Sequence, residues 1–165
     1  MVSITKFKTE YNKYERVYYV VPLESAICPV CSSALSQKGR AKRKVTMTDG
    51  EKRVMKVRRL KCVSCKTSHR ELPDIIVPYK RHCAETIEGI INVGGSTAYC
   101  ESSTINRIKA WWAAMQLYIE SVLKAIKERH GIDLAAAKKL AEIVRSLTNT
   151  HFWPGTRSAL APGRK

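Results

Sequence analysis

The chain has 165 residues, 44% of them hydrophobic, which is enough for one compact domain or two small ones and excludes a long unstructured polymer. Its 30 lysine and arginine residues outnumber 14 acidic residues, so a surface with a net charge of +16 should attract phosphate polymers or anionic membranes. No apolar run approaches the roughly 18 to 20 residues that span a bilayer, and the charges in residues 1–10 do not fit a signal peptide, so we expect a soluble, cytoplasmic protein.

The N-terminal segment, residues 1–27, contributes little to the excess charge, because its four basic residues are nearly balanced by three acidic ones. It is rich in tyrosine between residues 11 and 19. Residues 16–21 combine β-branched and aromatic side chains, which are enriched in strands. We expect this strand to add to the side of the domain that follows it.

Two Cys-x-x-Cys pairs, Cys28 with Cys31 and Cys62 with Cys65, are separated by thirty residues. Two residues between cysteines let both sulfurs point into one site from a tight turn, and two such turns supply the four thiolates of a closed tetrahedral zinc site. In a chain without an export signal, paired cysteines favour metal over disulfides, because cytosolic thiols stay reduced. The pattern predicts one structural Zn²⁺; the alternative is buried thiols that merely fall in pairs.

The residues around the cysteine turns add two expectations. Zinc-binding turns usually have glycine directly after the second cysteine, where the backbone enters the left-handed region. Ser32 and Lys66 occupy these positions and should adopt that conformation at some cost. His69 lies four residues after Cys65 and could replace a ligand, but with four thiolates present we expect it at the surface or facing phosphate.

The stretch between the pairs is expected to form a β-hairpin. Asp49-Gly50 is a strong turn dipeptide, and the β-prone residues 42–48 and 52–61 flank it. Two cysteine turns, a hairpin and one metal ion are the layout of a zinc ribbon.

Most of the net positive charge lies in and around this hairpin, since residues 28–70 hold 13 basic and two acidic side chains. Like charges on facing strands repel unless a polyanion neutralises them, which predicts nucleic-acid contact; a solvated face that aids solubility is the alternative. Such phosphate contacts position a protein without reading bases. The predicted contact residues are Arg40, Lys42, Arg43, Lys44, Lys52, Arg53, Lys56, Arg58, Arg59 and Lys61.

After Pro78 the apolar pattern changes to helical spacing. Residues 82–92 should form a helix that glycines end, and the polar residues 102–104 offer an N-cap for a second helix. This arrangement could be a helix-turn-helix, whose second helix enters the major groove by its first turns. Its candidate contacts are Asn106, Arg107 and Lys109; an ordinary helical hairpin with a wet polar face is the alternative.

Apolar residues spaced by three and four from Ile105 to Ile126 predict one long helix over residues 103–129. Gly131 should end it, and Asp133 can cap a further helix that runs to Leu147. We expect these two helices to pack on each other and on the ribbon. The alternative is that the apolar seam associates with a second copy and makes a homodimer through helix 103–129.

The remaining features are small. Cys83 and Cys100 have no partner at metal-binding spacing and should be small core residues. The aromatics Phe152 and Trp153 should dock on the core, although they could stack on bases. The predicted fold is therefore α+β, a small β zinc ribbon followed by an α-helical region with a helix-turn-helix-like part and a long helical hairpin. We divide it into residues 1–78 (strand and ribbon), 79–150 (helices) and 151–165 (a loosely ordered tail).

The order of these motifs resembles a family. Cys-Pro-x-Cys, the basic hairpin, Cys-x-x-Cys, the segments 69–73 and 76–81, and residues 100–105 with tryptophan soon after are similar to a family of bacterial proteins. That family resembles the zinc-ribbon and helix-turn-helix front end of insertion-sequence transposases. The likeness covers about residues 28 to 113, with residues 152–158 as a further echo. It implies mobile-element DNA binding, with zinc on Cys28, Cys31, Cys62 and Cys65 and a reading helix at residues 103–112.

The chain departs from transposases in its carboxylates. Strand transfer needs several carboxylates that hold two metal ions, and the only aspartates are Asp49, Asp74 and Asp133. Since no Gly-rich phosphate loop or nucleophile elbow is present either, we do not expect an enzyme. We expect a zinc-stabilised DNA-binding accessory or regulator, nucleoid-associated and without a membrane partner. The alternatives are an RNA-binding zinc-ribbon module, or a protein-interaction module that uses the long helix.

Overall fold

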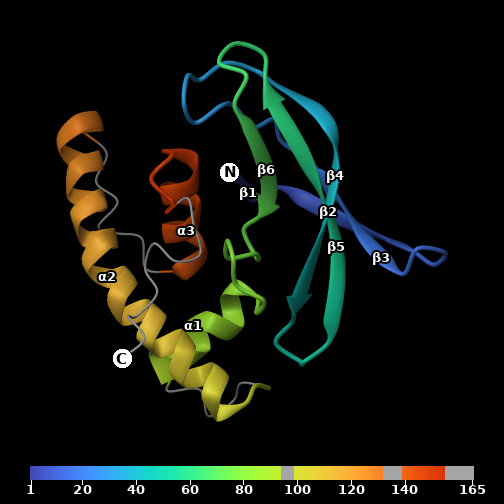
Figure 1. The fold of residues 1–165 in the computed structure, drawn as a ribbon, viewed down its shortest axis with the longest axis vertical. Helices are drawn as coiled ribbons and strands as arrows, with labels where there is room; N and C mark the ends of the chain where they lie inside the picture. Colours follow the sequence, from blue (N-terminus) through green and yellow to red (C-terminus); the bar gives the residue numbers. More distant parts are fainter. Residues whose placement is uncertain (94–98, 132–138, 155–165) are drawn as a thin grey trace.

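The computed structural model describes residues 1–93, 99–131 and 139–154. A curled six-stranded sheet forms one side of the molecule and three helices form the other (Figure 1). The strands are β1 (Val2–Ile4), β2 (Phe7–Asn12), β3 (Val17–Pro22), β4 (Leu35–Thr46), β5 (Lys52–Cys62) and β6 (Ser68–Pro73). The helices are α1 (Ala84–Val93), α2 (Ser102–His130) and α3 (Leu140–Asn149). The predicted order of a β part followed by a helical part is confirmed.

The hairpin predicted around Asp49-Gly50 is the longest β unit of the chain. β4 and β5 pair antiparallel from Leu35 opposite Cys62 to Thr46 opposite Lys52, so the hairpin reaches back to the cysteine turns. Gly50 has a φ of 84°, the left-handed conformation that favours glycine, and Asp49 Oδ1 accepts a hydrogen bond of 2.8 Å from the Glu51 amide. The hairpin thus has a base at the cysteine turns and a tip at Gly50, at opposite ends of the sheet (Figure 1).

The strand predicted at residues 16–21 is confirmed as β3. It pairs antiparallel with β2 and parallel with β5, where Tyr18 faces Met55 and Tyr19 faces Lys56. The sequence did not indicate β2, whose residues are mostly exposed and polar, or β1, which is only three residues long. β1 runs parallel to β6 and is fully buried.

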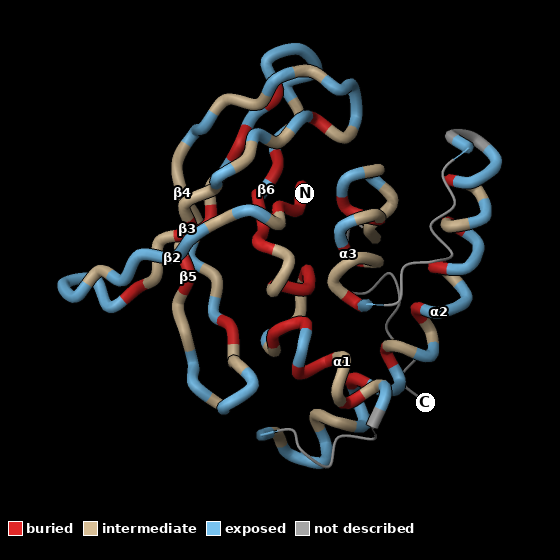
Figure 2. Tube along the Cα trace, turned by 180° about the vertical axis from the view of Figure 1, so that it is seen from behind, coloured by how far each residue is buried: buried red, intermediate tan, exposed pale blue. Residues whose placement is uncertain are grey.

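The sheet has its own apolar core, in which Val20, Val45, Met55, Val57 and Ile76 pack together. Side chains alternate between the two faces of a strand, so Met55 and Val57 share one face of β5. Leu60 and Cys62 lie on the opposite face and are also buried. Both faces of β5 are therefore covered, at different points along its length. In Figure 2, which colours the chain by burial, buried residues recur along the sheet and on the helices.

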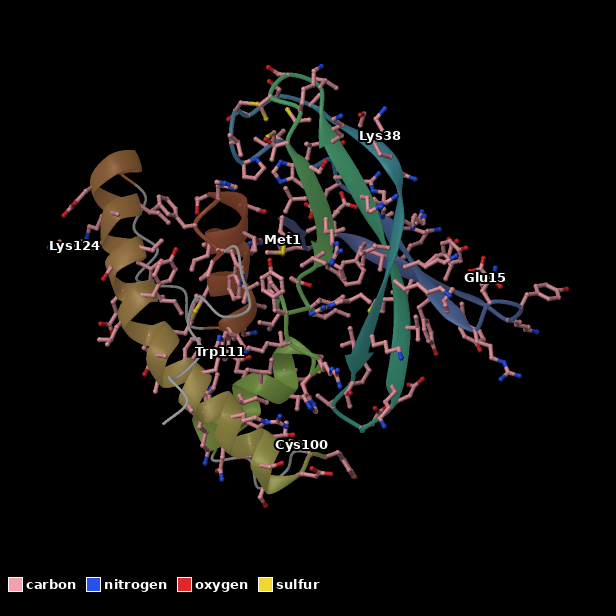
Figure 3. The ribbon with its side chains drawn as sticks, in the orientation of Figure 1. Met1, Glu15, Lys38, Cys100, Trp111 and Lys124 are labelled. Atoms are coloured by element: carbon pink, nitrogen blue, oxygen red, sulfur yellow. The ribbon has the colours of Figure 1, made fainter. Side chains whose placement is uncertain are left out.

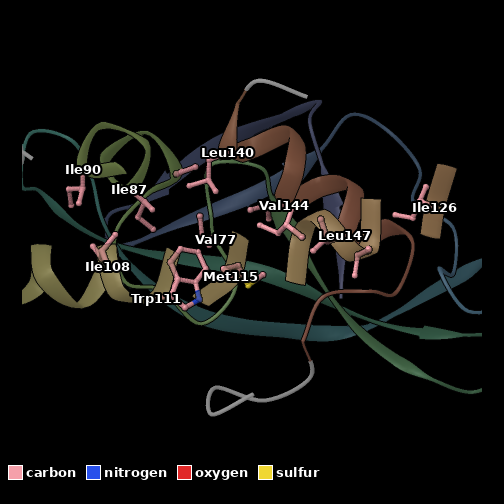
Figure 4. Packing of buried hydrophobic residues seen from close by; sticks show 13 residues of the cluster. Val77, Ile87, Ile90, Ile108, Trp111, Met115, Ile126, Leu140, Val144 and Leu147 are labelled. Atoms are coloured by element: carbon pink, nitrogen blue, oxygen red, sulfur yellow. The ribbon is translucent and has the colours of Figure 1, made fainter. Parts of the chain in front are cut away.

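The helices have a second apolar core, built around α2 (Figure 4). The predicted seam, which ran through Trp112, is buried at Ile108 and from Met115 to Ile126. At the tryptophan position the prediction is wrong, because Trp111 is the buried residue, at 8% exposed, and Trp112 is only partly buried. The seam packs against α1 and α3 inside the chain, while a homodimer through helix 103–129 stays a prediction. The core side chains are Val77, Ala84, Ile87, Ile90, Ile108, Trp111, Met115, Ile119, Val122, Ile126, Leu140, Val144 and Leu147.

The ends of α2 test the capping predictions. Gly131, with a φ of 66°, closes the helix as predicted, and its amide donates to the Lys127 carbonyl. The N-cap prediction is wrong, because Glu101 is the cap residue and residues 102–104 already belong to the first turn. No helix in the described ranges is long and apolar enough to cross a membrane.

The segments around α2 bear on three further predictions. The glycine break falls in residues 94–98, outside the described residues, so the helix-turn-helix stays a prediction. The start predicted for the following helix lies in residues 132–138, which are also outside them, and α3 is described from Leu140. Cys83 is buried in the sheet core, as predicted, and Cys100 packs partly buried against the helical core.

The last described residues fold back onto the helices. Phe152 and Trp153 pack against the helical core, and their amides both donate to the Leu147 carbonyl. The Tyr118 hydroxyl donates to the Phe152 carbonyl. The prediction that these aromatics dock on the core is confirmed. The rest of the predicted tail, residues 155–165, lies outside the described residues.

Polar contacts join the two cores. The Ser3 amide donates to Asn149 Oδ1 at 2.7 Å, and Asn149 Nδ2 donates to the Ser3 carbonyl at 3.0 Å. Within the helical part, the Leu140 amide has no acceptor inside α3, as is usual in a first helical turn, and it donates to Glu88 of α1 at 3.2 Å. The end of α3 is therefore bonded to β1, across the division we drew near residue 78.

Candidate metal centre and basic surfaces

The four cysteines of the two pairs meet at the base of the hairpin. Their sulfur atoms all lie within 4.8 Å of one another. Cys28 Sγ is 3.6 Å from Cys65 Sγ, and Cys31 Sγ is 3.4 Å from Cys62 Sγ. Four sulfurs bound to one Zn²⁺ at about 2.3 Å stand about 3.8 Å apart, so these separations fit a single ion. Four cysteines are therefore positioned to hold one metal ion, as predicted, and the identity of that ion as Zn²⁺ stays a prediction.

The backbone of the two turns explains why the sulfurs converge. Cys28 lies in a turn in which its amide donates to the Ser33 carbonyl at 2.9 Å, and the Cys62 amide donates to the Thr67 carbonyl at the same distance. Ser32 and Lys66, the residues after the second cysteine of each pair, have φ values of 58° and 62°. Both positions predicted to be left-handed are so, although neither residue is glycine.

The thiols differ in how readily they lose a proton. Burial raises the pKa of Cys28 to about 11. Hydrogen bonds from Ser33 lower the pKa of Cys31 to about 6, and hydrogen bonds from Thr67 lower that of Cys65. Metal binding requires all four thiolates, so a bound cation must displace the proton of Cys28. The cluster therefore needs a cation to be stable in its charged form.

His69 contacts this cluster, and our expectation that it faces solvent or phosphate is wrong. The side chain is 3% exposed, and its Nε2 atom is 3.5 Å from Cys28 Sγ. Its Nδ1 atom is 3.3 Å from the Met1 amino group. Burial lowers the pKa of His69, which favours the neutral ring, with one nitrogen that donates and one that accepts. Its position in β6 follows from alternation, since His69 and Glu71 share the buried face.

Five of the ten hairpin cations predicted to contact nucleic acid are bonded within the protein. Arg58 forms two hydrogen bonds of 2.6 Å with Glu71, which is fully buried. Arg43 donates to the Lys80 carbonyl at 2.7 Å. Lys56 pairs with Glu15. We call this group the braced cations, and it consists of Arg40, Arg43, Arg53, Lys56 and Arg58.

The premise of an uncompensated cluster is therefore wrong for the braced cations. Arg40 donates to the Val20 and Lys56 carbonyls, and Arg53 pairs with Glu51. These bonds tie β4 and β5 to β3, β6 and the loop after β6. Apart from the local pair of Arg53 with Glu51, the sequence does not indicate these bonds, because the partners are backbone carbonyls or carboxylates from distant segments.

The other five are exposed, and we call them the exposed cations: Lys42, Lys44, Lys52, Arg59 and Lys61. Within the described ranges, none of their side chains makes a hydrogen bond or an ion pair. Lys42 and Lys44 share one face of β4, and Lys52, paired with Thr46, lies on the same face of the hairpin. Lys42 also lowers the pKa of Glu15, after the larger effect of Lys56.

The three candidate residues on α2 are all exposed. Arg107 bonds back to the Ser103 carbonyl at 3.3 Å and to the Thr104 hydroxyl at 3.0 Å. Asn106 and Lys109 lie on the same exposed first turns of α2. Whether this turn reads bases stays a prediction.

Comparison with known families matches residues 28–108 to a family model described as a domain of unknown function, DUF6431. No curated protein and no solved structure matched the chain. The matched segment begins at Cys28 and ends at Ile108, so it contains both cysteine pairs, the whole hairpin and the first turns of α2. The chain is similar to this family over the part that carries the metal cluster, and the likeness to transposases stays a prediction.

Proposed function

We propose that the chain is a zinc-stabilised DNA-binding protein with an accessory or regulatory role at mobile elements, and that the hairpin contacts phosphates. The exposed cations carry this proposal. They are like charges on one hairpin, without internal partners in the part of the chain that is described, and a phosphate backbone would relieve their repulsion.

The metal has a structural role in this proposal. Cys28 and Cys31 precede β4, Cys62 ends β5, and Cys65 lies in the turn that follows β5, so an ion bound to all four would fix the base of the hairpin. A set of four thiolates suits Zn²⁺ in a closed structural site, where the ion supplies folding energy and not a reactive water. A hairpin that is fixed at its base loses less conformational entropy when it lies along a phosphate backbone.

Sequence preference must come from another element, because phosphate contacts do not read bases. The first turns of α2 carry Asn106, Arg107 and Lys109, all exposed. Asparagine and arginine are side chains that pair with adenine and guanine edges in the major groove. We assign base reading to this turn as part of the same proposal.

The test is the salt dependence of binding to a labelled DNA duplex. The variant replaces three exposed cations of one face, Lys42→Ser, Lys44→Ser and Lys52→Ser. A matched control removes the same charge from exposed lysines away from the hairpin, Lys6→Ser, Lys13→Ser and Lys124→Ser. Braced cations such as Arg58 are unsuitable, because removing them would leave Glu71 buried and unpaired.

We expect the plot of log affinity against log salt to become shallower by about 3 for the hairpin variant, since each lost phosphate contact lowers the slope by about 0.9. The control should change it far less. Equal slopes for the hairpin variant and the control would rule out the hairpin as the contact surface. Competition with single-stranded DNA and structured RNA at fixed salt completes the test, and a preference for structured RNA would replace DNA as the partner.

A further inference from the structure

A basic cleft lies at the tip of the hairpin, at the opposite end of the molecule from the cysteines. Its volume is ≈ 1050 Å³, and it lies between the hairpin tip, the loop after β6 and the first turns of α2, near Cys100 in Figure 3.

The charge of this lining is strongly positive on all three sides. Lys44 and Lys52 come from the hairpin, Lys80 and Arg81 from the loop, and Arg107 from α2. Arg53 is also present but is paired with Glu51. Glu101 is the single carboxylate among the described lining residues. Field lines focus in a concave surface of one charge sign, which raises the local concentration of anions.

The loop that carries Lys80 and Arg81 is fixed to the edge of β4. The Thr46 amide donates to the Arg81 carbonyl at 2.7 Å, and the Cys83 amide donates to the Thr46 carbonyl at 2.9 Å. Arg43, a braced cation of β4, donates to the Lys80 carbonyl. The loop is thus held in place before any ligand binds, which reduces the entropy lost on binding.

Two opposing effects act on the charge of Lys80, whose side chain is half-buried. Its ammonium nitrogen lies 3.9 Å from the centre of the Trp111 ring, and the electron-rich face of that ring attracts the cation. Burial lowers the pKa of Lys80 to about 8. The described residues offer Lys80 no carboxylate partner, and a phosphate bound in the cleft would supply the missing negative charge.

We propose that this cleft holds the backbone phosphates of the bound DNA, so that the hairpin tip and the start of α2 grip one strand between them. This inference rests on the proposed function and adds a location that the sequence did not indicate. Lys80 and Arg81 join the contact set. Arg107, which lines the cleft, is reassigned from base reading to a phosphate, and base reading stays with Asn106 and Lys109. The exposed cations Lys44 and Lys52 connect the face of the hairpin to the cleft.

The experiment compares two double variants of the full chain in the duplex-binding assay. The cleft variant is Arg81→Ser with Arg107→Ser, and both side chains are exposed, so the fold should survive. The control is Arg16→Ser with Arg145→Ser, which removes the same charge from the β2–β3 turn and from α3. Thermal unfolding of both variants checks that they are folded.

We expect the salt slope of the cleft variant to fall by about 2, against little change for the control. Lys80 should also be protected from amine acetylation by bound duplex, whereas Lys124 should not. If the unaltered protein binds DNA but the cleft and control variants have equal slopes, or if Lys80 is acetylated equally with and without DNA, the cleft is not the phosphate site and the proposed function stands. If the unaltered protein shows no salt-dependent binding, the proposed function fails and this inference fails with it.

Discussion

The base and the tip of the β4–β5 hairpin are ordered by different means. At the base, four sulfurs converge within 4.8 Å, the side chains of His69 and Glu71 are buried, and Arg58 pairs with Glu71. At the tip, backbone hydrogen bonds join Thr46 to the loop after β6. The base thus contains four thiols that could hold a metal ion and a buried carboxylate, whereas the tip is held by backbone hydrogen bonds. Changes of chemistry should therefore affect the base first.

The largest effect should come from loss of the metal through Cys62→Ser. Cys62 is buried and is one of four ligands, so the variant should bind no zinc and lose several kcal/mol of the free energy of unfolding. Elemental analysis and thermal unfolding measure both changes. Cys100→Ser is the matched control, because Cys100 lies in the helical half and should leave the zinc content at one ion. Full zinc content in the Cys62 variant would contradict the four-cysteine site.

A smaller effect is expected from Glu71→Ala, which leaves the Arg58 guanidinium without its partner. Removing one member of a buried pair costs about 3 kcal/mol, reduced here because the Arg58 side chain is 22% exposed. Urea unfolding at neutral pH measures the change. Glu10→Ala is the control, since its pair with Lys8 is more than half exposed and should be worth about 0.5 kcal/mol or less. Equal losses in the two variants would show that Arg58 is not braced.

The smallest expected effect that distinguishes the base of the hairpin from its tip is that of lower pH. The folded thiols must be deprotonated to hold metal, so the apparent zinc affinity should fall as pH falls. The pKa of Cys28 is about 11, so its proton must be displaced at neutral pH, and this thiol alone contributes about a tenfold loss of zinc affinity for each pH unit. Below the pKa of Cys31, about 6, one further proton competes and the fall should steepen.

Competition with a chelator across this pH range measures the zinc affinity. The helicity of α2, which lies outside the metal site, serves as the internal control. A zinc affinity that does not change with pH would mean that the thiolates are not the ligands.

The parts of the fold that local pattern dictates were predictable. The cysteine spacing, the Asp49-Gly50 turn and the three-four spacing of α2 each encode their structure within a few residues, and each is confirmed. The parts set by distant contacts were not. The burial of His69 could not be predicted, because alternation places His69 and Glu71 on one face of β6 but does not tell which face meets the core. The braced cations were likewise indistinguishable from the exposed ones until their partners were known.

The bond between Asn149 and Ser3 has a consequence for how the chain folds. The two residues are 146 positions apart, so the contact between β1 and α3 can form only after α3 has left the ribosome, although β6, the sheet partner of β1, is made earlier. The cysteine turns and the hairpin, whose contacts are nearer in sequence, can form earlier, while the chain is still being made. Until α3 has been made, this contact of β1 is missing, and a truncation before residue 140 would leave β1 with one side open to aggregation.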